Sequence, residues 1–194
     1  MKFEIFKFKN VTSTNDVAMR LIKNEQTKHG IVYANMQTKG RGTKGKKWIS
    51  HKGNLFNTIF FPLKKKYPPF NEFSIINPII ISDVIKHFCK SKQINLKFPN
   101  DIFLNGKKVC GILQELIYLN EKKYLIVGIG INIVSSPKIN QKYQSTNIYM
   151  ETKKKITSEE VFKFIVFSYE KFFISLKNYN YLNFKKKAER MAIN

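Results

Sequence analysis

Cysteine and histidine are scarce in this sequence, which argues against metal sites and disulfide frameworks. The chain has two cysteines, Cys89 and Cys110, and three histidines that stand apart from one another. Two cysteines outside any C-x-x-C pair predict reduced thiols and a cytoplasmic protein. The isolated histidines show no zinc-ligand spacing. The sequence therefore assigns no metal ligands.

Long apolar runs are also missing. The most apolar stretch, residues 73–89, contains Asn77, Pro78, Asp83 and Lys86, and it is too short and too polar to cross a bilayer. The first residues of the chain lack the apolar segment of a signal peptide. We therefore expect neither secretion nor association with a membrane.

Acidic residues are few, since 13 Asp and Glu stand against 35 Lys and Arg and the formal net charge is +22. Such a charge can mark a protein that binds nucleic acid or another polyanion. However, the only arginines are Arg20, Arg41 and Arg190, and nucleic-acid binders usually favour arginine for bidentate contacts. Residues with A/T-rich codons are abundant, so genome composition is the alternative explanation. The charge favours acidic partners without naming one.

Length and hydrophobic content predict one domain, residues 1–194. A chain of 194 residues with 43% hydrophobic residues can bury a core without metals or disulfides. Apolar patterns predict strands at residues 3–9, 30–36, 55–61, 96–98, 102–104, 109–119 and 124–133. Helical patterns follow residues 13–15, cover residues 71–90 and continue from a capping box at Thr157 and Glu160. The fold class is α+β, with a mixed, mostly antiparallel central sheet and packed helices.

Local patterns within these elements lead to further predictions. Asn-Gly at residues 105–106 predicts a tight hairpin turn. Regular alternation after that turn would place Lys108, Cys110 and Ile112 on one face of the strand. Phe164 falls on the apolar stripe of the last long helix, so we expect it in the core.

The segment at residues 37–48 is rich in glycine and basic residues. Gly40, Gly42 and Gly45 fit the dinucleotide-binding pattern G-x-G-x-x-G, and the P-loop pattern G-x-x-x-x-G-K matches apart from its final Ser/Thr. Both motifs require a helix after the loop. Residues 48–53 have no helical period, so we reject both interpretations. Backbone N–H groups and basic side chains can still converge on an anion here, and a solvated hairpin tip is the alternative.

A second group of polar residues surrounds the expected hairpin. Lys-Phe-Pro-Asn-Asp at residues 97–101 precedes the turn, and Lys108 follows it. Gly111 lies inside the next strand, and residues 128–132 also combine glycines in a buried strand with a polar residue after them. Glycine inside a strand suggests the close approach of a ligand or another backbone. A bulge or a packing requirement is the alternative at each position.

These segments, taken together and in this order, resemble the catalytic domain of biotin–protein ligases. Ser-Thr-Asn at residues 13–15 resembles the S-T-N of that family, and residues 37–48 resemble its Q-x-x-G-R-G-R-x-G-[RK]-x-W loop. Residues 97–101 resemble K-W-P-N-D, residues 108–115 resemble K-[LV]-x-G-I-L-x-E, and residues 128–132 resemble G-x-G-I-N. The last part of the chain carries little of the resemblance.

The resemblance implies a two-step ligase reaction. The family forms biotinyl-5′-AMP from biotin and ATP with Mg²⁺, and then transfers biotin to a lysine of a biotin-carboxyl-carrier domain, such as that of acetyl-CoA carboxylase. A carboxylate that attacks an α-phosphate meets anion–anion repulsion, which fixed cations and backbone donors lower. The chain itself needs no nucleophile, because the acceptor lysine belongs to the partner.

The resemblance also implies roles for individual residues. The expected catalytic residues are Arg41 and Lys108, which would hold the reacting carboxylate and the α-phosphate. The expected biotin-binding residues are Ser13, Thr14, Asn15, Gln37, Gly40, Arg41, Gly42, Thr43, Lys108, Gly111 and Gly130. The expected residues for ATP and the adenylate are Arg41, Lys44, Trp48, Asn100, Asp101, Lys108 and Asn132. Biotin would lie flat on the glycines, and Trp48 would border the adenine.

The sequence departs from the family pattern in three ways. Thr43 stands where the family has a second loop arginine, so the adenylate would escape more easily unless Lys44 takes that role. The motifs begin at residue 13, so we expect neither an N-terminal helix-turn-helix domain nor a DNA-binding role. We expect the family's small C-terminal β domain to be absent or truncated. The sequence leaves the oligomeric state open, with a homodimer among the alternatives.

The sequence is also compatible with three other functions. Lipoate–protein ligases share the adenylation chemistry, and the sequence alone does not define the shape of the pocket. A basic nucleic-acid-binding module would interleave exposed aromatic residues with lysines along a groove. A non-catalytic relative is a third alternative, although Arg41 and Lys108 are both present.

Overall fold

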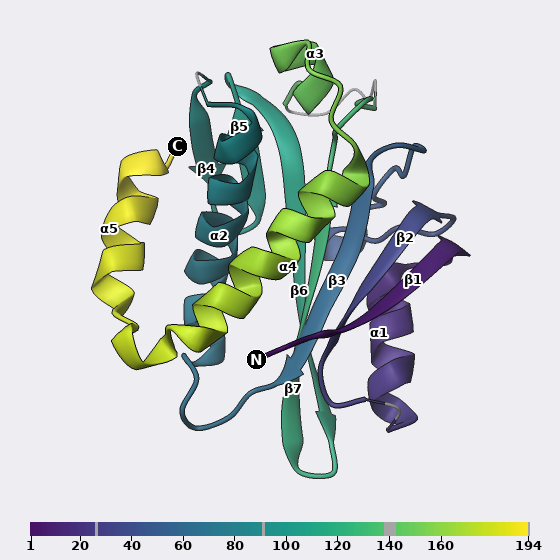
Figure 1. Ribbon diagram of the computed structural model, residues 1–194, viewed down its shortest axis with the longest axis vertical. Helices are drawn as coiled ribbons and strands as arrows, with labels where there is room; N and C mark the ends of the chain where they lie inside the picture. Colours follow the sequence, from purple (N-terminus) through teal and green to yellow (C-terminus); the bar gives the residue numbers. More distant parts are fainter. Residues whose placement is uncertain (26, 91, 138–142, 194) are drawn as a thin grey trace.

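The computed structural model describes residues 1–25, 27–90, 92–137 and 143–193. They form a seven-stranded sheet with the order β1-β2-β3-β7-β6-β5-β4 (Figure 1). The strands are β1 (Glu4–Val11), β2 (Gly30–Gln37), β3 (Leu55–Pro62), β4 (Ile94–Lys97), β5 (Asp101–Leu104), β6 (Lys107–Leu119) and β7 (Lys122–Ile131). The helices are α1 (Thr14–Lys23), α2 (Phe73–Phe88), α3 (Ile148–Thr152), α4 (Ser158–Ile174) and α5 (Tyr181–Met191). Only β1 and β2 pair in parallel within this sheet of described residues, which confirms the predicted fold class.

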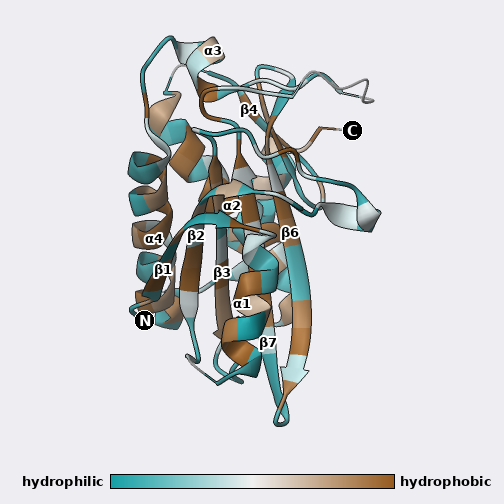
Figure 2. Ribbon diagram, turned by 90° about the vertical axis from the view of Figure 1, so that its right-hand side faces the viewer, coloured by the Kyte–Doolittle hydropathy of each residue, from teal (hydrophilic) through white to brown (hydrophobic). Residues whose placement is uncertain are grey.

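Helices cover both faces of the sheet (Figures 1 and 2). α1 packs on one face over β2, β3 and β7, whereas α2 and α4 pack on the other. The larger hydrophobic core lies between the sheet and α2 and α4, and it includes the fully buried Phe73, Ile165 and Tyr169. A smaller core beneath α1 contains Ala18 and Ile22. The central strand β7 is buried between these two layers, as its continuous apolar sequence predicts.

The long helix α4 begins as its sequence predicts. The Thr157 side chain accepts a hydrogen bond from the backbone N–H of Glu160, and the Glu160 carboxylate accepts one from the backbone N–H of Thr157. The prediction for Phe164 is wrong, because its side chain is 37% exposed while the neighbouring Phe162 is buried. The apolar stripe of α4 is wider than the part of the helix surface that is buried. Phe162 lies on the buried part, and Phe164 lies at its edge. Among the described residues, no helix has the length and apolar character to span a membrane.

The hairpin between β5 and β6 has the predicted turn but an irregular register. Asn105 and Gly106 both have positive φ angles, 50° and 75°, as a two-residue hairpin requires. Ile102 pairs with Cys110, but Phe103 pairs with Lys108, so one residue of β6 is extra. This bulge reverses the alternation of side chains. The prediction that Lys108 shares a face with Cys110 is therefore wrong, since Cys110 lies in the larger core and Lys108 approaches Trp48 on the other face.

Both cysteines are free thiols within the core. Burial raises the pKa of Cys89 to about 11 and raises that of Cys110 further, so both are protonated at pH 8 and cannot act as thiolate nucleophiles. We expect neither to react with iodoacetamide at pH 8 in the native protein, and both to react in denaturant. Mass spectrometry counts the alkylated cysteines, and rapid labelling of the native protein would contradict the buried placement.

Candidate functional site

The glycine-rich loop folds back on itself over the face of the sheet that carries α1. The Trp48 backbone N–H donates to the Gly40 carbonyl at 2.9 Å, and the Gly42 N–H donates to the Lys46 carbonyl at 2.7 Å. Arg41 and Lys47 form a bridge between these two bonds. We call residues 40–48 the loop hairpin. Irregular backbone and a turn, and no helix, follow the loop before β3 begins at Leu55, which confirms the rejection of the P-loop and dinucleotide motifs.

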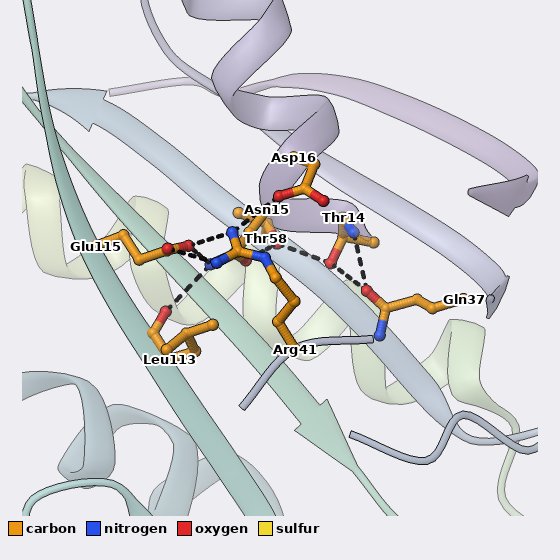
Figure 3. Close-up of polar contacts among 8 residues, drawn as sticks. All are labelled: Thr14, Asn15, Asp16, Gln37, Arg41, Thr58, Leu113 and Glu115. Carbon is orange, nitrogen blue, oxygen red and sulfur yellow. Dashed lines mark hydrogen bonds and ion pairs between the residues drawn. The ribbon is translucent and has the colours of Figure 1, made fainter. Parts of the chain in front are cut away.

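A polar network ties the start of α1 to β2 and β3 (Figure 3). Gln37 Oε1 accepts hydrogen bonds from Thr14 N at 2.8 Å and from Thr14 Oγ1 at 3.0 Å. Thr58 Oγ1 lies 2.8 Å from Thr14 Oγ1 and 2.6 Å from Asn15 Oδ1. Gln37 Nε2 extends the network to Ser50 Oγ at 3.1 Å. The structure thus brings together Thr14, Asn15 and Gln37, three of the residues that were expected to hold the biotin head group.

Arg41 joins this network through carboxylates. Its two terminal nitrogens donate to the two oxygens of Glu115, each at 2.7 Å, and Nη2 lies 2.8 Å from Asp16 Oδ1. Glu115 Oε2 also accepts a hydrogen bond from Asn15 Nδ2 at 2.7 Å. Hydrogen bonding to Glu115, partly opposed by burial, raises the pKa of Arg41. The guanidinium therefore carries a fixed positive charge at one end of the network.

Trp48 covers two of the glycines that were expected to bind biotin. A methyl group on Gly130 would lie 2.4 Å from Trp48 Cε2, and a methyl group on Gly111 would lie 2.7 Å from Trp48 Cζ3. The third strand glycine, Gly128, has the same relation to the Asn15 side chain. We call Gly111 and Gly130 the glycine surface. Its lack of side chains lets a flat ring lie against the backbone, which is the close approach that glycine inside a strand suggests.

Lys108 lies beside the same tryptophan. Its Nζ is 5.6 Å from the centre of a Trp48 ring and 2.6 Å from Asp101 Oδ1. Asn100 Nδ2 donates to the same Asp101 oxygen at 3.0 Å. The Lys108 side chain is 21% exposed and the Asp101 side chain 16%, so the pair is only partly screened by solvent. The bulge in β6 is what turns this lysine toward Trp48.

The two expected catalytic cations pair with different carboxylates, Arg41 with Glu115 and Lys108 with Asp101. Lys108 and Glu115, the partner of Arg41, are both on β6 with Gly111 between them. A strand rises about 3.3 Å per residue, so the backbone positions of these two residues lie about 20 Å apart. The site is therefore elongated, with Arg41 and the polar network at one end, the glycine surface in the middle and Lys108 at the other end.

The remaining expected residues surround this row less directly. Ser13 is the buried N-cap of α1, although its side chain makes no capping bond to the described residues. Thr43 is half-buried and Lys44 is exposed, both in the short turn at the tip of the loop hairpin. Asn132 is buried, and its Nδ2 donates to the Thr146 carbonyl at 3.1 Å. The Lys44 side chain is thus open to solvent, and the Asn132 amide is engaged with Thr146.

Sequence reasoning missed three residues of the site. Glu115 and Asp16 are the carboxylates that hold Arg41, and the fully buried Thr58 hydroxyl connects Thr14 with Asn15. A chemical argument could have found the two carboxylates. A half-buried arginine requires acidic partners, and the protein has few Asp and Glu residues that could serve.

A separate cavity of about 890 Å³ lies at the other end of β3 and β7. Pro62 and Tyr124, a paired couple on these strands, are among the residues that line it. The glycine surface is near the opposite end, where Leu55 pairs with Ile131. None of the residues expected at the site lines this cavity. The cavity is therefore distinct from the site described above.

Comparison with known proteins identifies relatives for this chain. A family profile described as the biotin/lipoate A/B protein ligase family matches residues 6–132. The chain is 32% identical over 133 residues to the bifunctional ligase/repressor BirA of Bacillus subtilis, which covers 66% of this chain and 39% of that protein. It is 30% identical over 127 residues to the biotin--[acetyl-CoA-carboxylase] ligase of Paracoccus denitrificans, which covers 64% of this chain and 52% of the relative. The chain thus spans about two fifths to one half of these relatives.

Solved structures agree with the sequence relatives. The biotin protein ligase of Leishmania major in complex with biotinyl-5-AMP superposes with a TM-score of 0.83 at 26% identity and covers 98% of this chain and 81% of that chain. The biotin protein ligase of Aquifex aeolicus in complex with biotin and ATP superposes with a TM-score of 0.80 at 29% identity. The match covers 98% of this chain and 78% of that chain. The profile match spans all five motifs from Ser13 to Asn132. This chain therefore belongs to the biotin/lipoate A/B protein ligase family.

Proposed function

We propose that this chain activates biotin with ATP to biotinyl-5′-AMP and transfers the biotinyl group to a lysine of a biotin carboxyl carrier domain. The observation that carries the proposal is the elongated row on β6, in which the glycine surface joins Lys108 to the polar network around Arg41. The related proteins from Leishmania and Aquifex, solved with biotinyl-5-AMP and with biotin and ATP, support the same ligands here.

The row supplies the groups that this reaction requires. The network of Thr14, Asn15 and Gln37 offers donors and acceptors to a urea-like ring. The glycine surface lets the ring system and its chain lie against the backbone. At the far end, Lys108 would meet the biotin carboxylate and the α-phosphate and would offset their repulsion as charge develops. This lysine already has a fixed direction because it pairs with Asp101.

ATP would bring Mg²⁺ to the Lys108 end of the row. Mg²⁺ commonly binds through one or two carboxylates, substrate phosphates and water. The Asp101 carboxylate is an oxygen ligand of this kind, and the Asn100 amide nitrogen donates a hydrogen bond to it. Among the described residues, no three His, Cys, Asp or Glu side chains gather into a site of their own, which fits a metal that arrives with the nucleotide. When bound, it would neutralise phosphate charge.

Transfer to a carrier domain tests the whole proposal. The purified chain is incubated with biotin, ATP, Mg²⁺ and an isolated biotin carboxyl carrier domain, and intact-mass spectrometry measures addition of one biotinyl group. We expect addition to the carrier, and no addition to a carrier in which the acceptor lysine is replaced by arginine. No modification of the intact carrier by folded protein would contradict the proposed transfer.

We also propose that the protein acts in the cytoplasm. Both cysteines are free, as is usual for proteins of that reducing compartment.

The net charge of +22 leads to a prediction about the carrier. If the carrier domain is acidic, long-range attraction accelerates its encounter with this chain, and salt screens that attraction. We expect the second-order transfer rate to fall about tenfold between 20 mM and 300 mM NaCl. Adenylate formation without the carrier is the control and should change much less. A transfer rate that is independent of ionic strength would show that the surface charge plays no part.

A further inference from the structure

Glu115 is the carboxylate that connects Arg41 with Asn15. It forms a bidentate pair with Arg41 and accepts a hydrogen bond from Asn15 (Figure 3). By contrast, Asp16 makes one contact with Arg41 at 2.8 Å. Bidentate arginine–carboxylate pairs fix orientation as well as charge. Glu115 therefore connects the loop hairpin, the start of α1 and β6 at one point.

The two large side chains of the loop hairpin are held very differently. Arg41 and Trp48 come from opposite strands of the hairpin. Three polar contacts hold the Arg41 guanidinium, whereas Trp48 Nε1 is buried without a hydrogen-bond partner among the described residues. A ligand on the glycine surface must displace the Trp48 ring. It can do so by side-chain rotation while the Arg41 pair stays in place.

Arg41 has a buried donor that faces no acceptor among the described residues. Glu115 and Asp16 take both terminal nitrogens, and Arg41 Nε is buried without a partner in the described part of the chain. A buried N–H without an acceptor is costly, so this atom marks a place where an acceptor would bind favourably. The Glu115 pair determines which way this N–H points.

We propose that Glu115 is a positioning residue of the site, which anchors Arg41 and with it the loop hairpin on β6. In this position the loop stays closed over the ligand while Trp48 moves aside. This inference rests on the proposed function for its ligand, but the anchoring itself is a property of the ligand-free protein. Removing the charge of Glu115 frees the loop hairpin, and biotin binding must then order it again.

Limited proteolysis tests the anchoring without any ligand. The loop hairpin and its flanks contain trypsin sites at Lys39, Arg41, Lys44, Lys46 and Lys47. We expect Glu115→Gln to raise the rate of cleavage in this segment about tenfold, because local opening sets the rate. Cleavage at residues 64–66, another exposed basic loop, serves as an internal control and should not change. Glu159→Gln, which removes an exposed ion pair with Lys7 far from the loop, is the matched variant.

Kinetics then tests whether Glu115 acts through Arg41. We expect Glu115→Gln to raise KM for biotin in pyrophosphate release about tenfold, with kcat changed less than threefold. In an Arg41→Ala background the same substitution should change KM less than twofold, because residues that act as a unit are not additive. Glu115→Asp keeps the charge and should recover part of the loss. A general destabilisation would instead act equally in both backgrounds.

Two results would overturn the inference. One is unchanged loop cleavage in Glu115→Gln, and the other is a KM for biotin that is unchanged or lower, which would mean that Glu115 holds Arg41 away from the ligand. If wild-type protein shows no biotin-dependent reaction, the proposed function fails, but the proteolysis result still decides whether Glu115 anchors the loop.

Discussion

Replacing Lys108 with alanine is expected to lower the rate of biotin-dependent pyrophosphate release about 10³-fold while the protein remains folded. Lys108 is the cation at the carboxylate end of the row, where negative charge develops on the α-phosphate. Loss of one such group in a partly dehydrated site typically costs a factor of this order. The fold should persist because Lys108 is outside both hydrophobic cores and Asp101 keeps its hydrogen bond from Asn100.

Lys107 provides the matched control. It is the preceding residue of the same strand, and the Lys107→Ala variant removes the same charge from the protein. We expect its pyrophosphate release to stay within threefold of the wild type. Circular dichroism and thermal unfolding show whether both variants fold alike. A folded Lys108→Ala protein with near-normal turnover would remove Lys108 from the reaction.

Replacing Gly130 with valine is expected to weaken biotin binding about 100-fold. Even a methyl group would come within 2.4 Å of Trp48, so a valine side chain occupies the space in which the Trp48 ring now lies and the proposed biotin ring would lie. Overpacking of this kind typically costs about 1–3 kcal/mol. Gly130 has no left-handed φ angle, so the loss reflects occupied space rather than backbone strain.

The same variant has a spectroscopic signature. Trp48 is the only tryptophan of the chain, so intrinsic fluorescence reports on this one ring. We expect the emission of ligand-free Gly130→Val to shift to longer wavelength, as the ring moves into water, and biotin to produce a similar shift in the wild type. Ile129→Val is the control, because Ile129 lies on the same strand in the core on the opposite face. Normal biotin affinity in Gly130→Val would contradict the role of the glycine surface.

Much of the fold follows from local patterns in the sequence. The Asn105-Gly106 turn and the Thr157–Glu160 capping box each depend on residues close together in the chain, and both are present. The central position of β7 follows from its apolar residues on both faces. The exposure of Phe164 was not foreseeable, because the breadth of the buried face of α4 depends on how the helix rests on the sheet.

The direction of Lys108 shows where periodic patterns fail. Simple alternation turns it toward the larger core with Cys110, but one extra residue in β6 turns it toward Trp48. The sequence contains no local signal for this bulge, which depends on pairing with β5. A functional side chain was thus recognised by its family motif, and its orientation came from the structure.

The site was identifiable as a set of motifs but not as an arrangement. Residues 37–48 and the strand glycines were expected to serve one ligand, and the structure places Trp48 directly on Gly111 and Gly130. That contact joins segments more than sixty residues apart, so no local pattern encodes it. The pairing of Arg41 with Glu115 is likewise a long-range contact, and it anchors Arg41 seven residues along β6 from Lys108.

The most direct test of the central claim is pyrophosphate release from ATP and Mg²⁺ by the purified protein with biotin, with lipoate and with neither. The account predicts release with biotin, little with lipoate and none without an organic acid, together with one biotinyl-5′-AMP formed per pyrophosphate. Release with lipoate but not with biotin would retain the adenylation chemistry and contradict the substrate. Folded protein that releases pyrophosphate with neither acid would contradict the account altogether.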